Sequence, residues 1–320
     1  MIFMPEEYTV EIISPTKKDE ILKEIANRRL FIRKANIHGM CIEIITDEKD
    51  FKEAWEDNFK FMSDDVRPHG RVVAIKSEGD FIVQYEPISK TCFIHNCDYY
   101  GYVKSIALAV AADFLEDYYS IHSRFSIHGS CIDFNGHGIA MIAPSGTGKT
   151  THSYGLLLCE GSKLVADDWF FVQITNNAVA YASEKNSYIR DDIGKNWHVF
   201  QPLVDNAKLD KYKRAIVSVE DVIGNDRLCE STTLKKIIIL KRDFNDENIL
   251  RKIEPREALL FLSKHDFCNP HQLVRDKRKI AMRLNFFNNL FKYTDVYMVN
   301  TIKDPDTTQA EIRKIVKEII

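Results

Sequence analysis

The stretch from Ala143 to Thr151 limits what this chain can fold into more than any other, because its composition is that of a phosphate-binding loop. It matches the Walker A pattern G-x-x-x-x-G-K-[ST] except at the first position, where Ala143 still keeps the side chain small. Glycines in such a loop let backbone N–H groups turn toward a phosphate, and the lysine adds a positive charge. The residues expected to hold the phosphates of a nucleotide are Ser145, Gly146, Thr147, Gly148, Lys149, Thr150 and Thr151.

The segments on either side of this loop have the patterns that it requires. The apolar run 139–142 predicts a buried strand before the loop, and the sequence through 154–158 continues a helical pattern after it. Upstream, residues 125–134 predict another strand, and Asn135-Gly136 is the strongest short signal for a β-hairpin turn. We therefore expect a hairpin that leads into a strand, the loop and a helix.

Two adjacent carboxylates, Asp167 and Asp168, end the next predicted strand, 163–166. A strand in this place commonly ends in an acid that holds Mg²⁺ or its water ligands, with Thr150 as the hydroxyl ligand. Two carboxylates can divide the work: one, for which we expect Asp167, can hold the metal shell, while the other accepts a proton from an attacking hydroxyl or binds a second cation. On their own, these two residues would be interpreted as a polar turn; the loop beside them favours a functional role.

His128 lies on the strand before the loop strand, where it could be aimed at the terminal phosphate of a nucleotide. A single histidine on a strand is more often a half-buried structural residue. Its place beside the predicted loop makes it a candidate site residue.

Composition excludes several classes of protein. A chain of 320 residues with 45% apolar residues can bury a large core and form two domains. With 44 basic and 47 acidic residues, it has no overall positive field for nucleic acid. The seven scattered cysteines form no C-x-x-C pair, which is typical of a reducing compartment. The start lacks a signal-peptide pattern and the longest apolar stretch, 106–115, is too short to cross a bilayer, so we expect a cytoplasmic protein without a membrane partner.

The pattern of elements changes close to residue 101. Residues 1–100 predict short strands and helices of a small α/β or α+β domain, and a long apolar helix, 102–119, follows. We therefore expect an N-terminal domain over 1–100, with a share in selecting an acceptor, and a nucleotide-binding catalytic domain over 101–320.

Four motifs of the second domain resemble the catalytic domain of HPr kinase/phosphorylase. They are Ile-His-Gly at 127–129, Gly-His-Gly at 136–138, Ser-Gly-Thr-Gly-Lys-Thr at 145–150 and Leu-Val-Ala-Asp-Asp at 164–168, in the order of that family. The loop over 145–153 is also similar to that of ATP-dependent phosphoenolpyruvate carboxykinase, which shares the nucleotide-binding core. The resemblance implies an α/β fold of the HPr kinase/phosphoenolpyruvate carboxykinase-like P-loop type.

Weaker similarity to the carboxykinase continues over 183–190, 212–215 and 236–243. By this resemblance, Glu184 would approach the metal-nucleotide and Arg214 the transferred phosphoryl group. An arginine suits that place because negative charge is spread over the phosphoryl oxygens during transfer.

The two families assign the shared residues differently. In a kinase-like arrangement Asp168 is the base near the acceptor hydroxyl and His128 helps to orient the phosphate. In a carboxykinase-like arrangement His128 and Asp168 would hold a second divalent metal, typically Mn²⁺. Both alternatives stay open at the level of the sequence.

The sequence thus predicts a kinase that uses ATP and Mg²⁺ and transfers the γ-phosphoryl group to a hydroxyl. The acceptor would be a small metabolite such as serine, or a serine of a protein or peptide. One alternative is a phosphoenolpyruvate carboxykinase-like lyase, and another is a nucleotide-binding regulatory protein with little turnover. ADP or pyrophosphate as the phosphoryl donor, and assembly into a homo-oligomer, also stay open.

Overall fold

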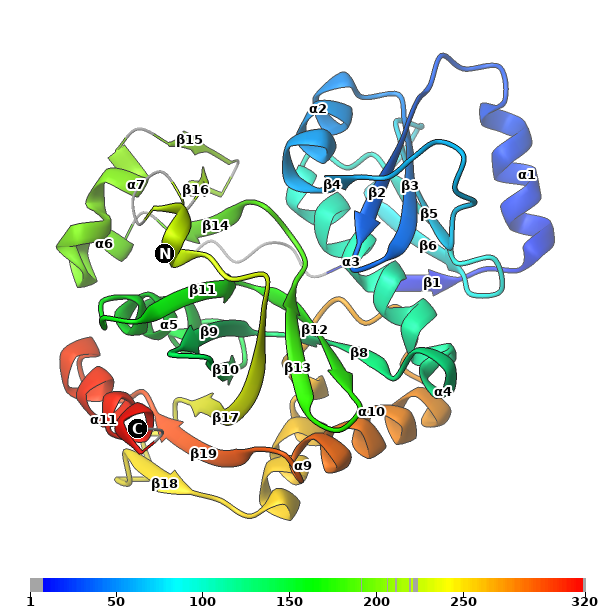
Figure 1. The fold of residues 1–320 in the computed structure, drawn as a ribbon. Coiled ribbons are helices and arrows are strands. Elements are labelled where there is room, and N and C mark those ends of the chain that lie inside the picture. Colours follow the sequence, from blue (N-terminus) through cyan, green and yellow to red (C-terminus); the bar gives the residue numbers. More distant parts are fainter. Residues whose placement is uncertain are drawn as a thin grey trace. The chain divides into compact units, whose positions relative to one another are not determined.

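Helices alternate with sheets of parallel and antiparallel strands along the chain, which is therefore a mixed α/β protein (Figure 1). The computed structural model describes residues 8–190, 192–205, 207–210, 212–218, 220 and 224–318. Packing divides the chain into two units, residues 1–118 with 271–275 and residues 119–270 with 276–320. No helix of the described residues is long and apolar enough to cross a membrane.

The described part of the first unit has a seven-stranded sheet in the order β1-β6-β7-β5-β3-β2-β4. Its elements are β1 (Val10–Ile12), α1 (Pro15–Ile25), β2 (Phe31–Ile37), β3 (Met40–Thr46), α2 (Lys49–Asn58), β4 (Lys60–Phe61), β5 (Gly70–Ile75), β6 (Ile82–Glu86), β7 (Thr91–His95) and α3 (Tyr100–Asp117). The start of helix α1 is capped, because the Ser14 hydroxyl accepts a hydrogen bond from the Lys17 N–H and Pro15 occupies the first turn.

Helix α3 belongs to the first unit by its packing, although the sequence pattern led us to expect it in the second domain. It lies against β3, β5 and β7. Inside this unit the buried Asp113 of α3 accepts hydrogen bonds from the Tyr85 hydroxyl, at 2.7 Å, and from the Lys90 ammonium. The division between the units accordingly falls after Tyr118, at the end of this helix.

The described part of the second unit has a nine-stranded sheet and a separate three-stranded sheet. Its elements are α4 (Tyr119–His122), β8 (Arg124–His128), β9 (Ser130–Phe134), β10 (His137–Ile142), α5 (Lys149–Leu157), β11 (Ser162–Ala166), β12 (Trp169–Ile174), β13 (Ala178–Ala182), β14 (Ser187–Arg190), α6 (Ile193–Asn196), η1 (His198–Phe200), α7 (Gln201–Asp205), β15 (Lys208–Leu209), β16 (Arg214–Val217), η2 (Asn225–Arg227), β17 (Ser231–Lys241), β18 (Leu250–Lys252), α9 (Pro255–Lys264), η3 (Asp266–Cys268), α10 (Lys277–Leu290), β19 (Asp295–Asn300) and α11 (Pro305–Lys317). The large sheet runs β11-β9-β10-β17-β13-β12-β8, with β19 beside β17 and β18 beside β19.

The hairpin expected from Asn135-Gly136 is present between β9 and β10. Both turn residues have a positive φ, 52° and 86°, as this type of turn requires. The single strand expected over 125–134 is wrong, because the chain changes partners at Gly129: β8 pairs with β12, whereas β9 pairs with β10 and β11. A Cβ atom on Gly129 would lie 2.6 Å from the Met141 carbonyl oxygen, so only glycine fits this bend.

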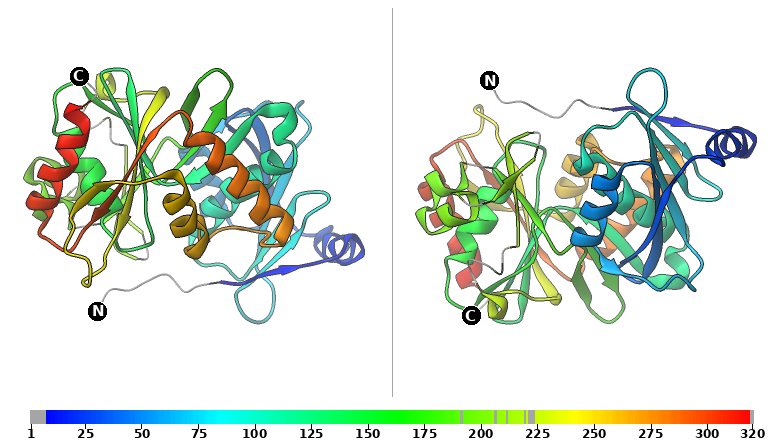
Figure 2. Two further views of the ribbon diagram at one scale, coloured as in Figure 1. Left: turned by 90° about the horizontal axis from the view of Figure 1, so that it is seen from below. Right: turned by 90° about the horizontal axis from the view of Figure 1, so that it is seen from above.

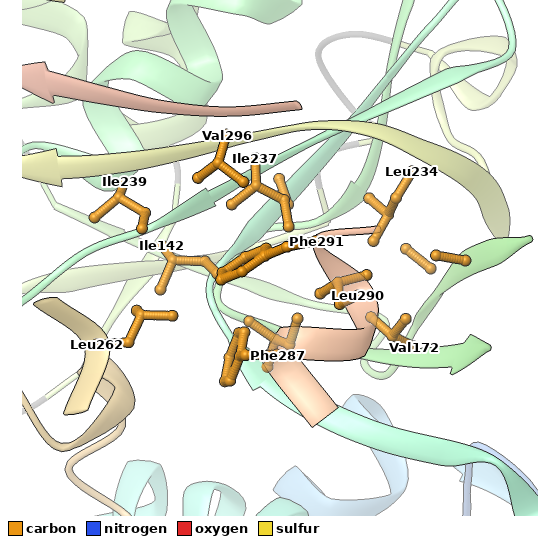
Figure 3. Close-up of a cluster of buried hydrophobic side chains, with 14 of the residues drawn as sticks. Ile142, Val172, Leu234, Ile237, Ile239, Leu262, Phe287, Leu290, Phe291 and Val296 are labelled. Carbon is orange, nitrogen blue, oxygen red and sulfur yellow. The ribbon is translucent and has the colours of Figure 1, made fainter. Parts of the chain in front are cut away.

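The large sheet is buried on both faces. Successive residues of β10 point to opposite sides, so that Ala140 and Ile142 join one core and Ile139 and Met141 the other. Helices α9 and α10 cover the first face, where Phe287, Phe291 and other apolar side chains surround Ile142 (Figure 3). Helices α5 and α11 cover the second face, and Figure 2 shows α10 (orange) and α11 (red) on opposite sides of the strands.

Phe286 of α10 allows a test of the core that α9 and α10 cover. It is 1% exposed and stacks on Phe125, with ring centroids 4.2 Å apart. We expect Phe286→Ala to lower the free energy of unfolding of the second unit by about 3–5 kcal/mol, because the cavity cannot close fully. Chemical denaturation measures this, with Phe244→Ala as the control, since Phe244 is 78% exposed. Equal losses in the two variants would contradict the core assignment.

On the other face, His152 of α5 and Gln309 of α11 form a buried hydrogen bond of 2.9 Å between Nδ1 and Oε1. Burial lowers the pKa of His152 below its ordinary value of 6.5. The folded ring therefore stays neutral while the unfolded ring takes up a proton as the pH falls, so the unfolded state is the one stabilised by acid.

We predict that the free energy of unfolding falls as the pH drops below about 6.5, with a contribution from His152 of at most about 1.4 kcal/mol per pH unit. The His152→Gln variant should show a shallower fall over the same range in denaturation curves measured from pH 8 to pH 5. His198→Gln, at an exposed position, is the matched control. A slope that His152→Gln leaves unchanged would show that the ring is not buried as a neutral group.

Candidate active site

The loop 143–148 runs from the end of β10 to the first residue of α5. Gly146 and Gly148 have φ values of 78° and 97°, in the left-handed region that glycine adopts without strain. The Thr147 hydroxyl donates to the Pro144 carbonyl at 2.7 Å and closes the loop on itself. The loop thereby leads to the N-terminal end of a nine-residue helix, where free N–H groups and the helix dipole favour an anion.

Three of the residues singled out from the sequence meet at this helix end. The Lys149 ammonium donates to Asp168 Oδ1 at 2.6 Å, and His128 Nε2 lies 3.3 Å from the same oxygen. The side chains of Lys149 and His128 are largely buried, whereas that of Asp168 is 34% exposed. Asp168 is thus the member of the cluster that solvent reaches most easily.

Strand pairing explains why these three residues meet. Trp169, at the start of β12, pairs with His128 at the end of β8. The Gly129 N–H donates to the Asp168 carbonyl at 2.9 Å, which continues the contact beyond the strands. The turn that carries Asp167 and Asp168 is therefore fixed against the end of β8, and Lys149 approaches it from the loop.

A backbone group that the sequence analysis did not consider holds the imidazole of His128. Its Nδ1 lies 2.7 Å from the Cys268 carbonyl oxygen, at the end of η3. Burial raises the pKa of the Cys268 thiol to about 12, against an opposing effect of the Lys149 ammonium, so the thiol is a neutral part of the wall. No side-chain pattern marks this residue, because the contribution comes from its main chain.

The expected metal ligands lie on elements around the same turn. Asp167 is buried, and its charge adds to the burial that raises the pKa of the Tyr154 hydroxyl. Thr150 lies in the first turn of α5. Glu184 follows Ser183, whose hydroxyl donates to the Trp169 carbonyl at 2.6 Å, so the segment that carries it is tied to the residue after Asp168.

The side chains of Asp167, Glu184 and Thr150 carry oxygen atoms, the type of ligand that Mg²⁺ takes. Among the described residues, no group of three or more His, Cys, Asp or Glu is arranged to hold a metal ion. Mg²⁺ usually needs only one or two carboxylates, together with substrate phosphates and water.

Arg214 lies on β16 of the separate three-stranded sheet, and not on an element of the cluster above. Its Nε donates to Asp210 Oδ2 at 2.8 Å, and the guanidinium lies 5.9 Å from the centre of the Tyr188 ring. Burial lowers the pKa of Arg214 to about 10, which still leaves it positively charged at neutral pH. Arg214 is therefore a fixed cation.

The remaining loop residues differ in exposure. Ser145 and Gly146 are exposed. Thr147 is buried, and its hydroxyl is bound to the Pro144 carbonyl within the loop. The Thr151 carbonyl accepts a hydrogen bond of 2.7 Å from the Trp197 indole, which anchors the first turn of α5. The open part of the loop is thus at Ser145 and Gly146.

Comparison with known proteins gives partial similarity. No family model matches the chain. It is 31% identical over 83 residues to HPr kinase/phosphorylase of Chlorobium phaeovibrioides (strain DSM 265 / 1930), which covers 26% of this chain and 24% of that protein. It is 32% identical over 77 residues to HPr kinase/phosphorylase of Chlorobium chlorochromatii (strain CaD3), covering 24% and 22% of the two chains. The chain thus spans about a quarter of the length of these curated relatives, and the similarity suggests a kinase-like protein of that kind over this part alone.

Proposed function

We propose that this protein is a kinase that transfers the γ-phosphoryl group of ATP, with Mg²⁺, to the hydroxyl of an acceptor. The observation that carries the proposal is the contact of Lys149 and His128 with one oxygen of Asp168 at the N-terminal end of α5. It combines a cation for phosphate with a carboxylate that can accept a proton. The partial similarity to two proteins named HPr kinase/phosphorylase supports the same chemistry.

In this proposal the loop and the first turn of α5 bind the phosphates. Backbone N–H groups of residues 145–151 would surround them, and Lys149 would turn from Asp168 to the β- and γ-phosphate oxygens. Thr150 and Asp167 would hold Mg²⁺, with Glu184 close to it. When bound, the metal neutralises charge on the phosphate oxygens.

Asp168 would be the base. Its Oδ1 accepts a hydrogen bond from the Lys149 ammonium at 2.6 Å. When Lys149 turns to the phosphates, this oxygen of Asp168 would be released from the lysine. It can then take the proton of the acceptor hydroxyl while the hydroxyl oxygen bonds to phosphorus and the bond to the β-phosphate oxygen breaks, which leaves ADP.

The other assignments follow the resemblance to the carboxykinase and complete the proposal. His128 would orient the phosphoryl group and Arg214 would stabilise its charge during transfer. The first unit would help to select the acceptor, either a small hydroxyl metabolite such as serine or a serine of a protein or peptide.

One observation favours a second candidate, a carboxykinase-like lyase that uses Mn²⁺. Because a carbonyl oxygen only accepts hydrogen bonds, the contact with Cys268 puts the hydrogen of the neutral imidazole on Nδ1 of His128. Its Nε2 lone pair then faces Asp168, and a nitrogen and an oxygen donor side by side suit a transition metal. Release of CO₂ from oxaloacetate in the presence of Mn²⁺ would distinguish this lyase from a kinase.

We predict opposite effects of Asp168→Asn on binding and on catalysis. The variant should bind ATP at least as tightly as the native protein, because Lys149 no longer has a competing carboxylate. It should transfer phosphate about 100-fold more slowly or worse, because the base is lost. Calorimetry measures the binding, and γ-labelled ATP with a panel of hydroxyl metabolites and a cell extract measures the transfer.

The control for this experiment is Lys149→Met, which should weaken ATP binding about tenfold or more because a charged hydrogen bond to phosphate is lost. If label leaves only as free phosphate, at equal rates in the native protein and Asp168→Asn, Asp168 is not the base. That result would favour a nucleotide-binding regulatory protein.

The neighbouring carboxylates should differ in their dependence on Mg²⁺. We expect Asp167→Asn to raise the Mg²⁺ concentration that gives half-maximal transfer about tenfold or more, as loss of a charged ligand does. Asp168→Asn should lower the maximal rate of transfer without changing the Mg²⁺ concentration that gives half-maximal transfer. Magnesium titrations of the two isosteric variants make the comparison, and the reverse pattern would exchange the two roles.

A further inference from the structure

The segment η3 between α9 and α10 has an unusual backbone. Its three residues, Asp266, Phe267 and Cys268, have φ values of 48°, 54° and 56°. None is glycine, although L-residues visit this left-handed region rarely and then mostly one at a time. Such a conformation persists where the surrounding structure imposes it, and it is concentrated at functional sites.

Packing and hydrogen bonds hold this turn in place. Phe267 is buried and stacks on Phe287 with an angle of 9° between the rings. The Cys268 N–H donates to the His265 carbonyl at 2.7 Å. Phe267 and Cys268 belong to the same core as Ile142, the last residue of the strand before the loop 143–148. The turn is therefore fixed to the frame that also supports the loop.

The turn directs one carbonyl group, that of Cys268, at the candidate site. The Cys268 oxygen lies 2.7 Å from Nδ1 of His128, and Nε2 of the same ring lies 3.3 Å from Asp168 Oδ1. Since the carbonyl can only accept, Nδ1 carries a hydrogen in every protonation state that keeps this contact. The ring thus always presents Nε2 to Asp168, in the way that outer partners orient a functional histidine.

We propose that the left-handed turn Asp266–Cys268 is a positioning element for His128, which fixes the tautomer of the imidazole and holds its Nε2 at Asp168. The inference rests on the proposed function for its effect on phosphoryl transfer, but its effect on His128 is separate. A turn that relaxed to ordinary φ values would redirect the Cys268 carbonyl. The ring would then be free to rotate and to exchange its tautomer.

The test compares Cys268→Gly with Cys268→Val in the full chain. Glycine adopts a φ of 56° without strain, whereas a β-branched residue close to cysteine in size tolerates it worst. Long-range ¹H–¹⁵N spectra of histidine-labelled protein report the tautomer, with His128→Gln to assign the signals. We expect hydrogen on Nδ1 of His128 in the native protein and in Cys268→Gly, and a mixture of tautomers in Cys268→Val.

The kinetic consequence is a loss in kcat with little change in the KM for ATP. We expect kcat of Cys268→Val to be about tenfold or more below that of Cys268→Gly, because a small displacement of a reacting group costs that much. If Cys268→Val does not fold, Asp266→Val serves instead, since Asp266 is exposed and has a φ of 48°.

The spectra and the kinetics separate the two proposals. A neutral ring of His128 with hydrogen on Nε2 and none on Nδ1 in the native protein, or an unchanged tautomer and kcat in a folded valine variant, would overturn the positioning role. If the valine variant changes the tautomer and no acceptor is phosphorylated by any of the proteins, the positioning of His128 stands and the kinase proposal fails.

Discussion

The parallel pairing of β10 with β17 is the constraint on which the second unit depends. Apolar side chains leave β10 on both faces and are covered by α10 on one side and α5 on the other, so the strand cannot shift without opening two cores. The loop 143–148 begins where this strand ends. The buried strand β10 therefore fixes the position of the first residue of the loop. The loop contains glycines, but it starts from a rigid part of the sheet.

Local sequence signals predicted the parts of this fold that depend on neighbouring residues. Asn135-Gly136 indicated the hairpin, and the apolar run before Gly146 indicated the strand that leads to a helix at Lys149. The break at Gly129 was missed, because a glycine inside an apolar strand pattern looks like a continuation. The structure shows why this residue is glycine, because a Cβ atom would lie 2.6 Å from the Met141 carbonyl oxygen. The apolar pattern of α3 predicted a buried helix but gave no sign of the sheet on which it packs, and the structure places it against β3, β5 and β7.

The candidate site likewise has parts that the sequence motifs indicated and parts that only the fold brings together. The motifs singled out Lys149, Asp168 and His128, and the structure brings these three together, although their chemical roles stay predictions. The Cys268 carbonyl could not be found from the sequence, because every residue has such a group and only the fold directs one at His128. Arg214 was placed by resemblance alone, and its sheet is separate from the one that carries the cluster.

The five residues 271–275 make the first unit discontinuous in the sequence, because they are contributed from between α9 and α10. Leu273 is buried there, and Nδ1 of His271 lies within hydrogen-bond distance, 2.9 Å, of the Tyr8 hydroxyl oxygen. During synthesis on the ribosome, most of the second unit must therefore emerge before the first unit has all of its residues. The first unit therefore cannot be completed as soon as its first 118 residues have been made, and a chain cut at the boundary after Tyr118 would separate Leu273 from the unit in which it is buried.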